Sequence, residues 1–180
     1  QAVLGWRELD RLATQRDMLA EAVEVIRELF SGRLITHHGT HYRVDTARLY
    51  SVPDSPPPIF MSGFGEKAIK LAARLADGYI CVQPDADFVR LYRDSGGGDR
   101  PVQGGLKVCW GRDTGQAQQT MHRLWPNDAI PGESAQLLPL PRHFAQLSEL
   151  VSEYMISAPC GPSADDHIKG IRAYVDAGFD

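Results

Sequence analysis

Long hydrophobic runs are missing from this sequence of 180 residues. A membrane-spanning helix needs roughly 20 consecutive apolar residues, and the apolar runs here extend over only a few. The N-terminus also lacks the basic stretch and apolar segment of a secretory signal. We therefore expect a soluble, cytoplasmic protein without a membrane partner.

Cysteines are few, and their number is odd. Cys81, Cys109 and Cys160 are far apart in the sequence and form no Cys-x-x-Cys pair, so neither a disulfide framework nor a zinc site is indicated. Cys81 and Cys109 lie in apolar, strand-like segments, where a cysteine acts as a small hydrophobic residue. Cys160 is interpreted as an unreactive loop residue, because no neighbouring His or Lys indicates a lowered thiol pKa.

A large excess of either charge is also missing. The formal net charge is −4, with 19 basic and 23 acidic residues spread along the chain, so there is no basic stripe for nucleic acid to follow. Three histidines, His37, His38 and His41, are close together, but no carboxylate or thiolate stands beside them at metal-ligand spacing. We interpret them as the solvated surface of a hairpin rather than as a metal site.

The pattern of apolar residues predicts alternating helices and strands. An amphipathic helix is expected over residues 7–30, followed by a short, mostly polar hairpin that forms a surface appendage. Strands are then expected over residues 59–62, 79–82 and 106–110, and helices over residues 66–76 and 85–92. Two of these strands are nearly continuous apolar runs, as in parallel strands buried on both faces. The fold class is therefore α/β.

The later part of the chain has a different composition. Asp113 and Gln116 have the arrangement of a capping box for a helix, residues 142–154 form a helical stretch, and a last helix ends at Gly178. Residues 111–162, rich in Pro and Gly, are interpreted as an insertion. Because the chain starts with a helix and stops where another strand should begin, we expect residues 1–180 to be a partial domain, truncated at both ends.

Several stretches carry motifs that are informative together. They are Ala-Val-Glu-Val-Ile-Arg-Glu-Leu-Phe-Ser-Gly (22–32), His-Gly-Thr-His-Tyr (38–42), Ile-Phe-Met-Ser-Gly-Phe-Gly (59–65), Ala-Asp-Gly-Tyr-Ile (76–80), Leu-Trp-Pro-Asn (124–127) and Tyr-Val-Asp-Ala-Gly-Phe-Asp (174–180). In this order they resemble the coenzyme F420-dependent branch of the luciferase-like oxidoreductases, close to its glucose-6-phosphate dehydrogenase type. The resemblance implies the C-terminal half of a (β/α)8 barrel with an insertion between strands seven and eight, and a homodimer for the full-length protein.

A cofactor site is expected in the loop after the first predicted strand. Glycines there allow close backbone approach, and the N–H groups that begin the next helix can face an anion, although a lone Gly-x-Gly also suits a purely structural turn. The resemblance implies that this segment holds the phosphate and side-chain tail of the deazaflavin. The expected cofactor-binding residues are Ser62, Gly63, Phe64, Gly65, Lys67 and Ala68.

The expected substrate-binding residues are Val82 and Asp85. They fall where the family's sugar-phosphate dehydrogenases carry a Thr and a Lys that bind the substrate phosphate. Aspartate in place of Lys repels a dianion, and valine removes a hydrogen-bond donor. We therefore expect a small organic substrate other than glucose 6-phosphate.

The resemblance implies hydride transfer between coenzyme F420 and that substrate. In the family, the His, Trp and Glu near the reactive ring belong to the N-terminal half, so no catalytic residue is assigned in this chain. Two alternatives stay open. One is an FMN-dependent luciferase-like monooxygenase, and the other is a half-barrel without catalysis that binds a partner or dimerises.

Overall fold

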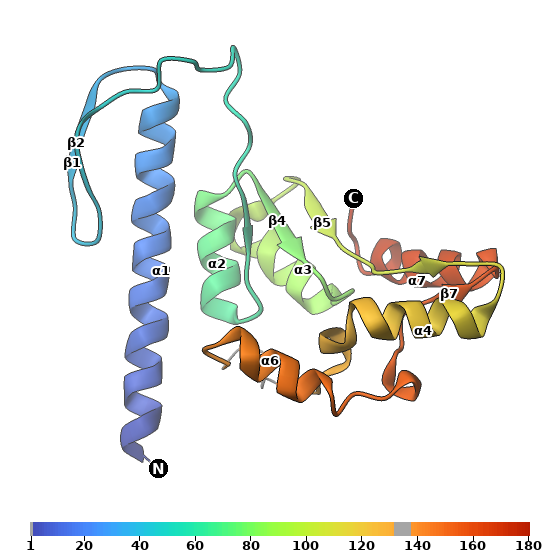
Figure 1. Cartoon of the computed structure of the whole chain (residues 1–180). Coiled ribbons are helices and arrows are strands. Elements are labelled where there is room, and N and C mark those ends of the chain that lie inside the picture. Colours follow the sequence, from blue (N-terminus) through green and yellow to red (C-terminus); the bar gives the residue numbers. More distant parts are fainter. Residues whose placement is uncertain (1, 132–137) are drawn as a thin grey trace. The chain divides into compact units, whose positions relative to one another are not determined.

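The computed structural model describes residues 2–131 and 138–180. By its internal contacts the chain divides into two compact units, Gln1–Gly104 with Ala177–Asp180, and Gly105–Asp176. Figure 1 shows the helices and strands of both units. No helix in the described parts of the chain combines the length and the apolarity needed to cross a membrane.

The first unit begins with a long helix and a hairpin. Helix α1 spans Ala2–Phe30, and strands β1 (Ile35–His38) and β2 (Arg43–Ala47) pair antiparallel with a bulge between Ile35 and His37. The hairpin runs beside α1 (Figure 1) and is tied to it through the carboxylate of Glu21. The predicted helix and hairpin are therefore confirmed, and Glu21 of α1 anchors the hairpin by accepting the N–H groups of His41 and Tyr42.

A parallel sheet lies at the centre of the first unit. Strands β3 (Phe60–Ser62), β4 (Gly78–Cys81) and β5 (Val102–Gly104) are adjacent in that order, and helices α2 (Glu66–Leu75) and α3 (Ala86–Tyr92) connect them. This confirms the predicted α/β class and the first four elements of the predicted β-α-β-α-β order, whereas the third strand of the sheet is β5 and not the strand predicted over residues 106–110. The largest fully buried side chains of the described residues all belong to this region: Tyr79, Tyr92, Ile69, Val102 and Cys81.

An arginine fixes the connection from α3 to β5. After α3 the chain makes a π-helical turn, Arg93–Gly97, in which Gly96 has φ 109°, and Gly98 follows with φ 55°. Both dihedrals lie in the region that glycine adopts without strain. The guanidinium of Arg100 donates to the carbonyl oxygens of Ala73, Ala76 and Gly96 and lies 5.8 Å from the centre of the Tyr92 ring. One side chain thus satisfies carbonyl groups at the end of α2 and in the π-helical turn that follows α3.

The strand predicted over residues 106–110 is wrong in its extent. Pairing occurs at β5, which lies beside β4, and at β6 (Cys109–Trp110), which pairs parallel with β7 (Cys160–Gly161). Residues 105–108 between them are not in a strand. The apolar Leu106 instead packs under the last helix, where a Cβ added to Gly170 would come within 2.7 Å of Leu106 Cδ2.

The second unit contains three described α-helices, α4 (Thr114–Leu124), α6 (Pro141–Ser148) and α7 (Ala164–Asp176), and two short 3-10 helices, Pro126–Ala129 and Glu153–Met155. Asp113 caps α4 through a 2.8 Å bond from the Gln116 N–H, as the sequence predicts. The helix expected over residues 142–154 ends earlier, because the chain turns to bury Val151, whose carbonyl oxygen bonds the His122 ring at 2.6 Å. The predicted insertion, residues 111–162, includes residues 132–137, which lie outside the described part of the chain, and it stays a prediction.

Candidate functional site

The loop from β3 to α2 holds most of the predicted cofactor-binding residues. Gly63 packs so closely on the helix that an added Cβ would lie 2.6 Å from the Cβ of Ala68. Gly65 is the N-cap of α2, with extended backbone, and its carbonyl oxygen accepts the N–H groups of Ala68 and Ile69 at 2.9 and 3.0 Å. A Cβ added to Gly65 would meet nothing within 4 Å. The loop is therefore pressed against α2 at Gly63 and open at Gly65.

The first turn of α2 is available to an anion. No side chain caps this described helix start, so the N–H groups of Glu66 and Lys67 lack the side-chain acceptor found at many helix N-termini. Lys67 is exposed in the same turn, and Phe64 beside it is 44% exposed. Free N–H groups, the helix dipole and an ammonium group all favour negative charge at this point.

A tyrosine buried beneath the loop fixes its position. The hydroxyl of Tyr79, on β4, donates a 2.6 Å hydrogen bond to the carbonyl oxygen of Gly63. The Tyr79 ring stacks on that of Tyr92, with centroids 5.1 Å apart and planes 19° from parallel. Burial raises the pKa of Tyr79 well above its ordinary value of 10.0, so the phenol stays a neutral donor. The loop thus rests on a rigid aromatic pair.

The predicted substrate residues follow the neighbouring strand. Val82 comes directly after β4 and is 56% exposed, and Asp85 is the N-cap of α3, accepting the N–H groups of Asp87 and Phe88 at 2.9 and 3.1 Å. An open depression of about 410 Å³ is lined by Gln83, Pro84, Asp85, Ala86 and Asp87. Because β3 and β4 are parallel, their carboxyl ends, and with them both predicted groups, lie at the same edge of the sheet.

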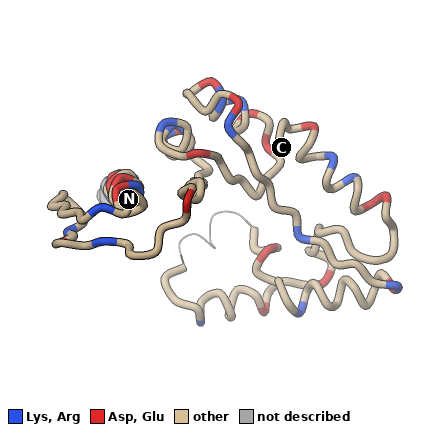
Figure 2. Tube along the Cα trace, turned by 90° about the horizontal axis from the view of Figure 1, so that it is seen from above, with Lys and Arg blue, Asp and Glu red and all other residues tan. Residues whose placement is uncertain are grey.

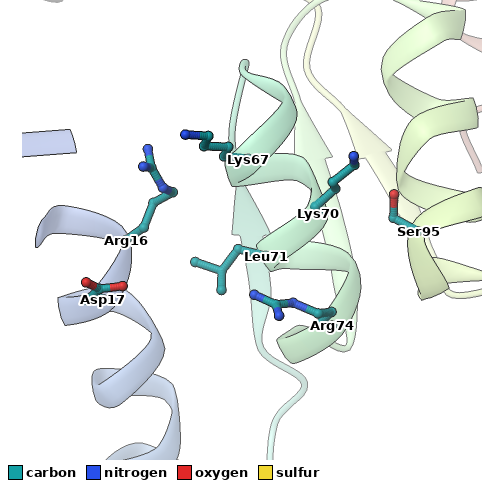
Figure 3. Close-up of a pocket in the computed structure, with 7 residues that line it drawn as sticks. All are labelled: Arg16, Asp17, Lys67, Lys70, Leu71, Arg74 and Ser95. Atoms are coloured by element: carbon teal, nitrogen blue, oxygen red, sulfur yellow. The ribbon is translucent and has the colours of Figure 1, made fainter. Parts of the chain in front are cut away.

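Sequence reasoning missed a cationic cleft between α1 and α2. It has a volume of about 580 Å³ and is lined by Arg16, Asp17, Lys67, Lys70, Leu71, Arg74 and Ser95. Figure 3 shows Lys67, Lys70, Leu71 and Arg74 on one helix and Arg16 and Asp17 on the other. The sequence feature that could have predicted this cleft is the spacing of Lys67, Leu71 and Arg74, which places three side chains on one face of a helix.

The hairpin histidines are hydrogen-bonded to carboxylates. His37 bonds Glu21 at 3.1 Å and His38 bonds Asp45 at 2.5 Å. Burial alone would raise the pKa of Glu21, but the N–H of Tyr42, the His37 ring and the N–H of His41 bond its carboxylate and lower the pKa to about 2. Among the described residues there is no group of three or more His, Cys, Asp or Glu side chains that could hold a metal ion.

The cysteines have different environments. Cys81 is completely buried, which confirms its role as a small core residue. Cys160 lies in β7 and is the register partner of Cys109 on β6, so its interpretation as a loop residue is wrong. Because β6 and β7 are each two residues long and lie far apart in the sequence, no local sequence pattern predicts their pairing. Burial, and then the neighbouring Cys109, raise the pKa of the Cys160 thiol.

Comparison with known proteins places these features in context. The sequence model of the luciferase-like monooxygenase family matches residues 4–180. An F420-dependent glucose-6-phosphate dehydrogenase from Nakamurella multipartita is 30% identical over 89% of this chain and 51% of its own length. An F420-dependent hydroxymycolic acid dehydrogenase from Mycobacterium tuberculosis is 30% identical over 91% of this chain and 47% of its own length.

A solved structure shows the same fold. An F420-dependent secondary alcohol dehydrogenase, in complex with an F420–acetone adduct, superposes with a TM-score of 0.76 at 24% identity, covering 93% of this chain and 55% of that one. The predicted fold class, half of a luciferase-like (β/α)8 barrel, is therefore confirmed. The chain spans about half the length of the curated relatives it matches.

Proposed function

The chain belongs to the luciferase-like monooxygenase family, and from that membership we propose an oxidoreductase that transfers a hydride between coenzyme F420 and a small organic substrate. The named relatives act on glucose 6-phosphate, hydroxymycolic acid and a secondary alcohol. What their names share is dependence on F420. The cofactor is therefore the part of the proposal with the broadest support.

The loop between β3 and α2 is the observation that carries the proposal. We assign the cofactor phosphate to the open side of Gly65 and to the N–H groups that begin α2, with Lys67 supplying a positive charge. Ser62, Gly63, Phe64 and Ala68 complete the proposed site, because they form the loop and the helical turn that packs on it. When bound, the deazaflavin ring itself accepts or donates the hydride. The residues of this chain would hold its phosphate end.

The proposed substrate is not a sugar phosphate. Among the described residues that line the depression after β4, Asp85 and Asp87 are acidic and none is a cation. The carboxylate of Asp85 is held at the start of α3 by two backbone N–H groups, so it cannot turn away without losing its capping bonds. A phosphate dianion at this position would meet repulsion, whereas a neutral alcohol or carbonyl compound would not.

A ligand titration tests this function. It uses the protein as its gene encodes it, because the relatives are about twice as long as this chain. Fluorescence is followed during addition of F420 and, separately, of FMN, to the wild type, to Lys67→Glu and to Lys169→Glu, a matched charge reversal on the exposed face of α7. We expect F420 to bind, Lys67→Glu to weaken it about tenfold, and Lys169→Glu to leave it unchanged.

Other outcomes have definite meanings. Binding of FMN without F420 would assign the protein to the flavin monooxygenases of the same family. Binding of neither cofactor would leave a barrel segment with a structural or partner-binding role. Light scattering of the same sample would test the homodimer that the family resemblance implies.

A further inference from the structure

Two cysteines lie opposite each other on neighbouring strands of the second unit. Cys109 belongs to β6 and Cys160 to β7, and they are register partners in this parallel pair. We propose that they form a site of reversible oxidation, at which a small organic disulfide that enters the cavity beside α7 converts the two thiols into an intramolecular disulfide. The site is separate from the cofactor loop and from the depression after β4, and the proposal does not depend on the function proposed above.

The register of β6 and β7 brings the two thiols within the range of a disulfide. The Cys109 N–H donates a 2.9 Å hydrogen bond to the carbonyl oxygen of Pro159, the residue before Cys160. Neighbouring strands lie about 4.8 Å apart, and Cα atoms joined by a disulfide are roughly 4.4–6.8 Å apart. Because side chains at directly opposed positions leave the sheet on the same face, neither strand has to slide for the two sulfurs to bond.

The thiols are free and influence each other. Both cysteines are unbonded and half-buried. Burial, and after it the charge interaction with Cys109, raise the pKa of the Cys160 thiol, as expected for sulfurs that lie near each other. A raised thiol pKa slows the reaction at neutral pH, because the thiolate is the nucleophile. The thiolate that does form is intrinsically more nucleophilic.

A cavity gives a small molecule access to one of the two thiols. It has a volume of about 490 Å³ and is lined by Cys160, by residues of α7 and by the segment before β7. This volume equals roughly 16 water molecules at liquid density, which is enough for a small organic disulfide. Acidic and basic residues are both present along α7 (Figure 2), and among the described residues of the cavity lining Asp166 is the one acid and Lys169 the one base. A neutral compound therefore suits the cavity.

The oxidation is a thiol–disulfide exchange in two steps. The Cys160 thiolate attacks one sulfur of the small disulfide, breaks its S–S bond and releases one small thiol, which leaves a mixed disulfide on Cys160. The Cys109 thiolate then attacks the Cys160 sulfur and expels the second small thiol. The two cysteines lose two electrons and two protons, and the small disulfide gains both, so the reaction balances.

The third cysteine provides an internal control. Cys81 lies on β4 of the first unit and is 0% exposed, so a disulfide in solution cannot reach it while the protein is folded. Cys109 and Cys160 are both partly exposed, so a reducing thiol can attack their disulfide and reverse the reaction. The odd number of cysteines in this chain is thereby explained by one core residue and one reactive pair.

Peptide mapping tests the proposal on the protein as its gene encodes it. The wild type, Cys109→Ser, Cys160→Ser and the matched control Cys81→Ala are incubated with hydroxyethyl disulfide near pH 9.0, the ordinary value above which the pKa of Cys160 is raised. Remaining thiols are alkylated, and trypsin digestion is followed by mass spectrometry without reduction. The three cysteines then lie in separate peptides, residues 75–90, 108–112 and 143–169.

We expect the peptides 108–112 and 143–169 to be joined in the wild type and in Cys81→Ala, and to separate after dithiothreitol is added. In Cys109→Ser the joined peptide should be lost, and Cys160 should carry the hydroxyethyl group, because no second thiol resolves the mixed disulfide. In Cys160→Ser the joined peptide should also be lost, and Cys109 should remain a thiol. Cys81 should remain a thiol wherever it is present.

Four results would each overturn the inference. Wild-type Cys160 that keeps the hydroxyethyl group beside an unreacted Cys109 would mean that the thiols are too far apart to bond. A lack of reaction at both cysteines would mean that the cavity does not admit the disulfide. A joined peptide that appears only together with modified Cys81 would mean that the thiols met in the unfolded chain. A joined peptide found only in a covalent dimer on a non-reducing gel would mean that the bond links two copies. Cofactor binding, measured separately, is unaffected by all four.

Discussion

The Tyr79 hydroxyl and the Gly63 carbonyl oxygen are joined by a 2.6 Å hydrogen bond beneath the proposed phosphate loop. Tyr79 is fully buried and stacked on Tyr92, so the bond connects a glycine-bearing loop to a buried aromatic pair of the core. Among the described residues, the buried hydroxyl of Tyr92 has no such partner. The two tyrosines therefore form a matched pair for mutation.

Tyr79→Phe should destabilise the protein by about 1 kcal/mol, because it leaves the Gly63 carbonyl oxygen without its donor while keeping the stacked ring. Tyr92→Phe should change stability little or raise it slightly, because no bond is lost. Urea denaturation of both variants measures the difference. Equal losses in both would mean that the Gly63 bond does not fix the loop.

Glu21→Gln should release the hairpin from α1. The folded pKa of Glu21, about 2, lies below its ordinary value of 4.5, so the carboxylate stabilises the hairpin above pH 4.5, and this contribution disappears as the pH falls through 2. The protection against hydrogen exchange, relative to the intrinsic rate at each pH, of the His41 and Tyr42 amides, which bond Glu21, should fall in the variant and, in the wild type, as the pH is lowered toward 2. Glu24→Gln, an exposed neighbour, is the control and should show no change.

Asp85 has two separable roles, capping α3 and placing negative charge in the depression after β4. Asp85→Ala should cost about 1 kcal/mol, the usual value of an N-cap, whereas Asp85→Asn should keep the cap. The Asn variant should also bind phosphorylated substrates more tightly than the wild type, because the repelling charge is gone. Thermal denaturation and inhibition by sugar phosphates measure the two effects. A stable Ala variant would show that the capping bonds carry no weight.

The thiols should differ in reactivity. Cys81, fully buried, should react with a disulfide reagent only on unfolding, whereas Cys160, which lines a cavity of about 490 Å³, should react in the native protein. Because the pKa of Cys160 is raised above 9.0, its rate should keep rising as the pH passes 9. Cys109→Ser should move this rise in the labelling rate of Cys160 to lower pH, since Cys109 contributes to the raised pKa of the Cys160 thiol. Rapid labelling at neutral pH would contradict this.

Local patterns predicted the parts of the fold that local forces determine. The helices capped by Asp85 and Asp113 begin where the sequence places them, because capping depends on residues within one turn. The strand over residues 106–110 is misplaced, since strand pairing is decided by distant partners such as β4 and β7. Hydrophobicity predicts that Leu106 is at least partly covered, which it is, but does not say whether a strand or a helix covers it.

The candidate site also has one part that the sequence predicts and other parts that depend on distant contacts. The loop at Gly63 and Gly65 is readable from its glycines, and the structure adds that they differ, one pressed on Ala68 and one open. The contribution of Arg16 to the cleft is unreadable, because it depends on which face of α1 meets α2. The clamp of Arg100 on the carbonyls of Ala73 and Ala76 is equally invisible, since side chain to backbone bonds across 27 and 24 residues have no sequence signature.

The composition of the three consecutive glycines at positions 96–98 is typical of a flexible linker. In the structure they instead form the ordered turn that follows α3. Gly96 and Gly98 are required for their dihedrals, whereas an added Cβ at Gly97 would lie 2.5 Å from the Tyr92 ring. A library of random substitutions should therefore be depleted at all three positions. Selection would keep the three glycines for two unrelated reasons, the backbone dihedrals of Gly96 and Gly98 and the lack of space at Gly97. An insertion in this segment would displace Arg100 and, through Tyr92, the loop proposed to hold the cofactor.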